Sequence, residues 1–360
     1  MVRKLILTFL YLFLPLASIA LTFRGLEHYL TEPFNPAQTQ TTLFSVAEHK
    51  SLREIAKELE QQHLIRSSWS LRIIARIQSK DTSIKAGEYQ LSAAMSAEQI
   101  LDKMVNGEMV LHRVTIKEGA RVSEIGQLLE QSGIVSQLLF DQALQNQALL
   151  SELGIQANSF EGYLFPETYQ FPRNTPANKV ITTMREQFNK AWQAEWEQQA
   201  VALKMSKHEI LTLASIIEKE SGNFEEQPII SSVFHNRLNR NMRLQADPTV
   251  IYGIVNFNGN ITKNDLQKFT PYNTYLIRGL PPGPIANPGI SAIKAALYPA
   301  QTNYLYFVGN GAGRHIFSED LDQHNNAVNQ FQRGDNDTDT DTDTDTDTDT
   351  PPAETTPIFP

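Results

Sequence analysis

The sequence contains no cysteine. This absence excludes disulfide bonds, thiolate nucleophiles and cysteine-ligated zinc sites. Zinc-protease spacing is also missing, because the His208-Glu209 pair has no second histidine at the required position. The chain has neither a G-x-S-x-G nucleophile motif nor a glycine pattern for binding phosphates. We therefore expect no metal and no cofactor.

The chain has no excess of basic residues. Its formal charge of −9 comes from 31 Lys+Arg and 40 Asp+Glu. Nine of the acidic residues lie in the C-terminal tail, namely Asp335, Glu354 and the seven aspartates of an Asp-Thr repeat, so the body has no net charge. A neutral body predicts no surface for nucleic acid. The tail, residues 334–360, is low in complexity and repels itself, so we predict that it is disordered.

Long uncharged runs are rare, and the clearest one is at the N-terminus. The 19 residues Leu5–Phe23 are long enough to span a bilayer. Arg3 and Lys4 precede them and favour an N-terminus in the cytoplasm. The alternative is a cleaved signal peptide, for which Ser18-Ile-Ala20 loosely fits the cleavage site. Because the run continues through Phe23, we predict an anchor at residues 1–23 and export of the remainder.

After a linker at residues 24–41, two similar segments lie 70 positions apart. Residues 46–61 and 116–131 align without gaps, and each predicts a short strand, a turn and an amphipathic helix. A unit this small must pack against a neighbour. The pattern resembles LysM domains, which bind glycans that contain N-acetylglucosamine. We assign residues 42–140 to a LysM-like module, and a purely structural repeat without a ligand is the open alternative.

Residues 148–333 form a second predicted domain. A hairpin is predicted over residues 304–317. Helices are predicted at residues 177–199, 206–221, 228–239, 291–297 and 319–331. The predicted fold class is α+β, with an N-terminal transmembrane helix, the LysM-like strand–helix module and a mixed α+β catalytic domain.

The helix at residues 206–221 carries the first candidate for chemistry. Ser206 and Glu209 have the spacing of a capping box, and the apolar residues of Ile210–Ile217 recur as one buried stripe. Glu218 and Glu220 flank this stripe in the last turn, where desolvation and the helix dipole raise a carboxyl pKa. A general acid needs that shift. Helix geometry does not choose between the two glutamates, and a helix edge with two solvated glutamates is the simpler alternative.

Other segments concentrate aromatic and polar residues. Tyrosines stack on sugar rings, and Asn, Gln and Asp bind hydroxyl groups, so these segments suit a carbohydrate site. Turn formation and packing would explain each segment taken alone. The segments are Glu161–Tyr169, His235–Arg237, Arg243–Thr249 and the Pro-rich stretch from Pro271 to Pro284.

Several blocks resemble the endolytic murein transglycosylase family, also called YceG-like. The resemblance extends from about Leu5 to Phe331. The blocks are Ala214–Glu220, Val233–Leu238, Met242–Gly253, Tyr272–Tyr275, Gly279–Gly283 and Tyr304–Val308.

The resemblance implies a lyase that cuts the bond between N-acetylmuramic acid and N-acetylglucosamine in nascent glycan strands and leaves a 1,6-anhydro end. Its catalytic glutamate corresponds to Glu220. The expected partners are peptidoglycan strands, the membrane and peptidoglycan synthases, and the expected location is the cell inner membrane, with the catalytic domain in the periplasm. We predict substrate contacts from Glu167, Glu218, Gln245, Asp247, Tyr252, Asn273 and Tyr275.

Two other functions stay open. The first is a non-catalytic scaffold that binds peptidoglycan and positions synthases. The second is a hydrolase in which Glu220 works with a second carboxylate, Asp247 or Glu167, as ordinary glycosidases do.

Overall fold

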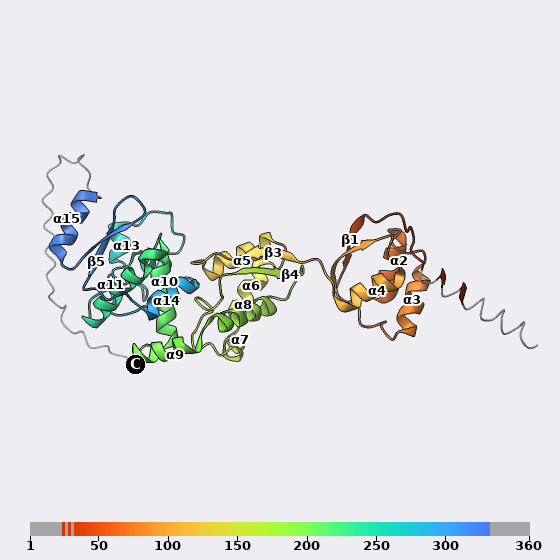
Figure 1. Ribbon diagram of the computed structural model, residues 1–360, viewed down its shortest axis with the longest axis horizontal. Coiled ribbons are helices and arrows are strands. Elements are labelled where there is room, and N and C mark those ends of the chain that lie inside the picture. Colours follow the sequence, from red (N-terminus) through yellow and green to blue (C-terminus); the bar gives the residue numbers. More distant parts are fainter. Residues whose placement is uncertain (1–23, 26–27, 30–31, 332–360) are drawn as a thin grey trace, which may run out of the picture.

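The structure, a computed structural model, describes residues 24–25, 28–29 and 32–331. The described chain is elongated, with an N-terminal module at one end and the C-terminal helices at the other (Figure 1). The predicted anchor at residues 1–23 and the predicted disordered tail at 334–360 lie outside the described residues. Within the described part, no helix combines the length and apolar character needed to cross a membrane.

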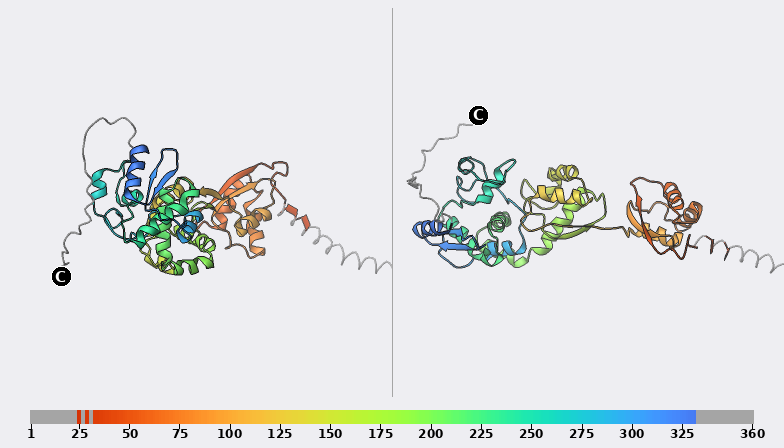
Figure 2. Two further views of the ribbon diagram at one scale, coloured as in Figure 1. Left: turned by 60° about the vertical axis from the view of Figure 1, so that its left-hand side comes forward. Right: turned by 90° about the horizontal axis from the view of Figure 1, so that it is seen from above.

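The N-terminal module has two strands and three helices around its own core. The strands β1 and β2 pair antiparallel, with Phe44 opposite Tyr89, and both side chains are buried. The buried side chains of this core run from Phe44 to Met104. The view from above shows the module set apart from the rest (Figure 2). Its elements are β1 (Thr41–Val46), α2 (Leu52–Gln61), α3 (Ser68–Ile77), β2 (Gly87–Ser92) and α4 (Ala97–Asn106).

The middle part contains the second of the two similar segments. Strand β3 pairs antiparallel with β4, with Val114 opposite Tyr169. The core that contains Val114 continues as far as Leu297 and is separate from the N-terminal core. The two similar segments therefore pack in different cores. The elements are β3 (His112–Thr115), α5 (Val122–Gln131), α6 (Gln137–Leu144), α7 (Gln147–Glu152), β4 (Thr168–Phe171) and α8 (Ala177–Ala191).

The chain passes from the N-terminal core to the second core between Met109, which packs against the first, and Val114, which is buried in the second. The predicted LysM-like module, residues 42–140, extends past this change, because α5 and α6 pack in the second core. The domain limits at 140 and 148 and the LysM-like character stay predictions.

The C-terminal part is built around helix α10. All eight residues of Ile210–Ile217 are buried, whereas the sequence predicted a single buried stripe. A helix that is buried on all sides lies inside the protein rather than on its surface. The surrounding elements are α9 (Ala194–Ala202), α10 (Lys207–Glu220), η1 (Phe224–Glu226), α11 (Gln227–Asn239), α12 (Asp247–Gly253), α13 (Lys263–Gln267), α14 (Ile290–Leu297), β5 (Tyr306–Gly309), β6 (His315–Ser318) and α15 (Leu321–Phe331).

One predicted helix was wrong. Residues 177–199 form two helices, α8 and α9, because the chain leaves the helical conformation at Trp192 with ψ of 114°. The break lets Trp192 pack edge-on against the buried Trp196. The sequence also did not predict the short helices α12 and α13. The predicted hairpin is confirmed as β5 and β6, and the mixed α+β class is confirmed.

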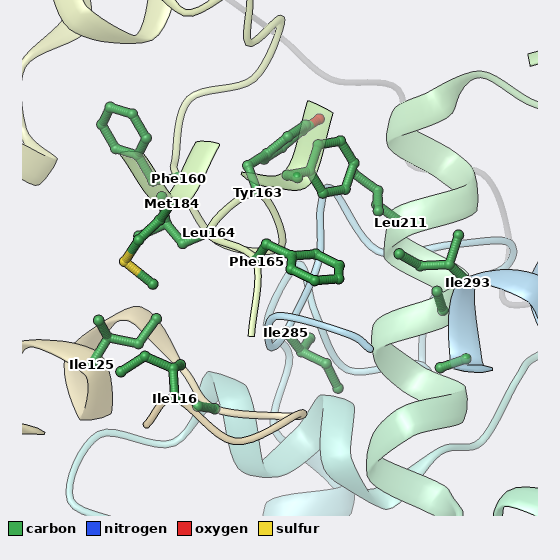
Figure 3. Packing of buried hydrophobic residues seen from close by; sticks show 14 of the residues in the cluster. Ile116, Ile125, Phe160, Tyr163, Leu164, Phe165, Met184, Leu211, Ile285 and Ile293 are labelled. Atoms are coloured by element: carbon green, nitrogen blue, oxygen red, sulfur yellow. The ribbon is translucent and has the colours of Figure 1, made fainter. Parts of the chain in front are cut away.

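One continuous core joins the middle and C-terminal parts. In Figure 3, Ile125 of α5 lies near Leu164 and Met184, while Leu211 of α10 lies on the other side. Phe165 lies between these groups. All five side chains are buried in the same cluster. The helix that ends at the candidate glutamates is therefore held by contacts from both parts.

Candidate active site

Helix α10 places two glutamates at its C-terminal end. The capping box is present, because Ser206 N–H donates to Glu209 Oε2 at 2.8 Å and Glu209 N–H donates to Ser206 Oγ at 3.2 Å. The helix then runs from Lys207 to Glu220, as the sequence predicted to within a residue at each end. Glu220 is thus the last helical residue, where the dipole disfavours an anion.

The two glutamates face different neighbours. Glu218 Oε2 accepts a hydrogen bond from the Gly289 N–H at 3.0 Å. Burial raises the Glu218 pKa, and the nearby charge of Glu118 raises it further. Glu220 instead lies near Asp247 and Arg237, whose charges shift its pKa in opposite directions. The divergence follows from their spacing of two residues on a helix.

Glu220 has the more strongly shifted carboxyl. Desolvation by the surrounding protein is the largest cause, and with the negative charge of Asp247 it raises the Glu220 pKa to about 8. The positive charge of Arg237 opposes this rise. The Glu220 side chain stays partly exposed to solvent. A carboxyl that keeps its proton near pH 7 and can still be reached is suited to act as a general acid.

Asp247 and Tyr275 come together beside Glu220. The Tyr275 hydroxyl donates to Asp247 Oδ1 at 2.6 Å. Burial and the Asp247 carboxylate raise the Tyr275 pKa, and the charge of Glu220 adds to this effect. The structure therefore gathers three of the predicted residues, which come from α10, α12 and the Pro-rich stretch.

Arg237 was not among the predicted site residues. Its buried guanidinium donates from Nε to the Leu305 carbonyl at 2.6 Å and from Nη1 to the Leu244 carbonyl at 2.9 Å and Gln245 Oε1 at 3.0 Å. Gln245 has a φ of 51°, in the left-handed region, and Arg237 stabilises that turn. The sequence analysis included the His235–Arg237 segment among the candidates for a carbohydrate site but gave Arg237 no role.

Asn273 supports the loop from inside. Its side chain is fully buried, and its Nδ2 donates at 2.9 Å to the carbonyls of Leu266 and Lys268. Its Oδ1 accepts from the Tyr275 N–H at 2.9 Å. Both ends of the amide are therefore occupied within the protein, and Asn273 fixes the backbone that carries Tyr275.

Tyr252 lies at the other end of α12 from Asp247. Its ring centroid is 4.7 Å from that of Tyr272, and its hydroxyl donates to Glu161 Oε2 at 3.4 Å. Glu161 is 3% exposed, and burial raises its pKa to about 8. The sequence analysis included Glu161 in an aromatic and acidic segment but did not single it out, because burial is not visible in the sequence.

Glu167 lies elsewhere. Its carboxylate is exposed and accepts from the Thr168 N–H, while its backbone carbonyl accepts from the Ile116 N–H beside β4. The structure thus brings Asp247 to Glu220 and leaves Glu167 in the β3–β4 sheet region. Over residues 24–25, 28–29 and 32–331, no three His, Asp or Glu side chains gather in a way that could hold a metal ion.

Comparison with known proteins gives consistent matches along the chain. The YceG-like family matches residues 44–330. A protein of Bacillus subtilis (strain 168) named endolytic murein transglycosylase is 30% identical over 318 residues, which cover 84% of this chain and 88% of that protein. A Streptococcus pneumoniae protein of the same name is 27% identical over 91% of this chain, which spans 65% of that longer protein.

A solved structure is also similar. A crystal structure of a protein described as yceG-like, from Listeria monocytogenes, matches with a TM-score of 0.56 and 32% identity. The match covers 80% of this chain and 99% of that one.

Proposed function

The chain belongs to the YceG-like family, and on this premise we propose that it is an endolytic peptidoglycan lytic transglycosylase. Its substrate would be the bond between N-acetylmuramic acid and N-acetylglucosamine within glycan strands. One observation carries the proposal. At the end of a buried helix, Glu220 is a partly exposed residue, and desolvation raises its pKa to about 8, so it holds a transferable proton at neutral pH.

The proposed reaction needs one carboxyl group. Protonated Glu220 donates its proton to the glycosidic oxygen, and the bond to the anomeric carbon breaks. The N-acetylglucosamine side leaves with a new hydroxyl group, and the muramyl ring becomes oxocarbenium-like. The C6 hydroxyl of that ring attacks the anomeric carbon and forms the 1,6-anhydro ring. Its proton passes to the Glu220 carboxylate, which restores the acid. The reaction therefore consumes no water and requires no metal ion.

The neighbours of Glu220 support both halves of this cycle. The negative charge of Asp247 favours the protonated acid before the bond breaks. The positive charge of Arg237 favours the Glu220 carboxylate that follows. Desolvation is the main cause of the raised Glu220 pKa, and these two opposite charges modify it, so the carboxyl can both give and take a proton near the working pH.

A second candidate is a hydrolase, because Asp247 lies near Glu220 and could activate a water molecule. Mass spectrometry of peptidoglycan digested by the purified protein separates the two. Muropeptides with 1,6-anhydro ends support the transglycosylase, and reducing ends support the hydrolase. No released product would favour the non-catalytic scaffold.

We also propose that Leu5–Phe23 anchors the protein in the inner membrane, with the remainder in the periplasm and near synthases of the cell wall. The support is the uncharged run after Arg3 and Lys4. Membrane fractionation with N-terminal sequencing tests the anchor. A mature N-terminus near Leu21 in a soluble periplasmic fraction would contradict it and leave the enzymatic proposal standing.

A further inference from the structure

A guanidinium group without a hydrogen-bond acceptor lies beside the candidate site. Arg121 precedes α5, is half-buried, and has its Cζ 5.2 Å from the centroid of the Tyr252 ring. Its backbone N–H donates to Glu124 Oε2 at 2.8 Å, but no acceptor among residues 32–331 binds its side chain. A guanidinium carries five N–H donors in a planar fork, so Arg121 has donors free for a ligand.

The turn that carries Arg121 is fixed against the end of α10. The Gly119 N–H donates to the Asn287 carbonyl, and the Asn287 N–H donates to the Ala120 carbonyl, both at 2.9 Å. Lys219 Nζ donates to the Gly119 carbonyl at 3.3 Å. Lys219 precedes Glu220 in the last turn of α10. Arg121 therefore lies two residues after Gly119, which contacts the end of the helix that carries Glu220.

Neither nearby carboxyl neutralises Arg121 by an ion pair. Glu161 is buried, and its Oε1 accepts from the Val122 N–H and from Asn287 Nδ2, both at 3.1 Å. Burial raises the Glu161 pKa to about 8 although the charge of Arg121 lowers it, so Glu161 is largely neutral at pH 7. Glu124 is exposed and uses its carboxylate to cap α5. The positive charge of Arg121 is thus left for another partner.

The distance between Arg121 and Glu220 can be gauged along helix α12. Asp247, beside Glu220, starts α12, and Tyr252, beneath Arg121, comes five residues later. Five residues advance a helix by about 7.5 Å. Tyr272, partly exposed, packs against Tyr252 and offers an aromatic ring at the same place. A short piece of glycan would span these two positions.

We propose that Arg121 binds a carboxylate on the peptide side chain of the glycan strand and selects strands that still carry their peptides. This inference rests on the proposed function. The guanidinium fork matches a carboxylate with two parallel hydrogen bonds, and stacking on Tyr252 holds the fork in place before the ligand binds.

The test compares Arg121→Gln with wild type on three substrates. These are native strands, strands whose peptide carboxyls have been amidated, and strands stripped of peptides by an amidase. We expect kcat/KM on native strands to fall about tenfold or more, mainly through a higher KM, because a charge-assisted bond is lost. On amidated and on stripped strands the variant should match wild type. Arg121→Lys should give an intermediate loss, because it keeps the charge without the fork.

Arg113→Gln is the matched control, since Arg113 is an exposed arginine on β3 of the same part of the chain. A loss no larger than that of Arg113→Gln on native strands would overturn the inference. A loss that persists on amidated strands would show a structural role instead. A loss on stripped strands that is absent on native ones would assign the contact to the lactyl carboxylate, which is free only after the amidase has removed the peptide, and would also overturn the inference.

Binding separates this inference from the proposed function. In a co-sedimentation assay with native strands, the inactive Glu220→Gln protein should bind more tightly than the Glu220→Gln, Arg121→Gln double variant. Amidated strands should remove the difference. Equal binding to native strands would contradict the role of Arg121, whether or not the wild-type protein cleaves glycan.

Discussion

The Tyr275 hydroxyl donates a 2.6 Å hydrogen bond to Oδ1 of Asp247, which joins two segments that are 28 residues apart in the chain. The bond holds the Asp247 carboxylate at the start of α12, where its charge raises the Glu220 pKa. The pKa of Glu220 therefore depends in part on Tyr275, which lies in a loop outside α10.

The first prediction concerns the acid itself. Glu220→Gln should lower the rate of glycan cleavage by about 10²–10⁴-fold, because the swap keeps the shape and removes the transferable proton. The rate is measured on purified strands, and thermal unfolding is followed to check the fold. Glu186→Gln, an exposed glutamate on α8, is the control for an identical substitution elsewhere. Full activity in folded Glu220→Gln, with activity lost in Glu218→Gln, would move the acid to Glu218.

The second prediction concerns pH. A general acid must be protonated, so kcat/KM should fall as pH rises through the Glu220 pKa of about 8. Asp247→Asn keeps an acceptor for Tyr275 but removes the negative charge, so the Glu220 pKa should drop and the fall should begin at a lower pH. The measurement is a pH profile of kcat/KM for both proteins. Asp141→Asn, at an exposed position of α6, should leave the profile in place. A shift to higher pH would be inconsistent with the charge effect.

The third prediction concerns the stability that Glu161 links to pH. Burial raises the folded pKa of Glu161 to about 8 from its ordinary value of 4.5, so the stability it contributes is fully present below pH 4.5 and is lost as pH rises through 8. Glu161→Gln cannot ionise and can still accept hydrogen bonds from Val122 and Asn287. As pH rises from 5 to 9, the free energy of unfolding of Glu161→Gln should increase relative to that of wild type by on the order of 4 kcal/mol.

Urea unfolding at both pH values measures this difference, and Glu186→Gln again serves as the control. An unchanged difference between wild type and Glu161→Gln across that pH range would mean that Glu161 is not protonated in the folded protein.

The fourth prediction separates backbone strain from steric overlap. Gly162 has a φ of 84°, and an added Cβ would overlap the ring of Pro284 in the Pro-rich stretch. Gly154 has a φ of 66° with open space around it. Gly154→Ala should cost about 1–2 kcal/mol of unfolding free energy from the left-handed backbone alone. Gly162→Ala should cost about 1–3 kcal/mol more, because the proline ring cannot rotate away. Chemical denaturation of the two variants gives both numbers, and equal losses would show that Pro284 moves freely.

The sequence by itself determined the local elements around the acid. The Ser206–Glu209 capping box determined where α10 begins, because capping acts within a few residues. The apolar period of residues 210–217 predicted one buried stripe, whereas the fold buries all eight residues. The same spacing showed that Glu218 and Glu220 cannot point the same way. It could not say which one is the acid, because both have the same local setting.

Tertiary structure gave the two glutamates different environments. Gly289 approaches Glu218, while Asp247 and Arg237 approach Glu220, and these partners come from segments that are distant in the sequence. Glu161 and Arg237 lie in segments that the sequence analysis marked as polar. The sequence did not show that burial raises the Glu161 pKa, or that Arg237 binds Gln245 and stabilises its turn. A pKa shift depends on desolvation and on charges brought close by folding, and neither can be read from neighbours along the chain.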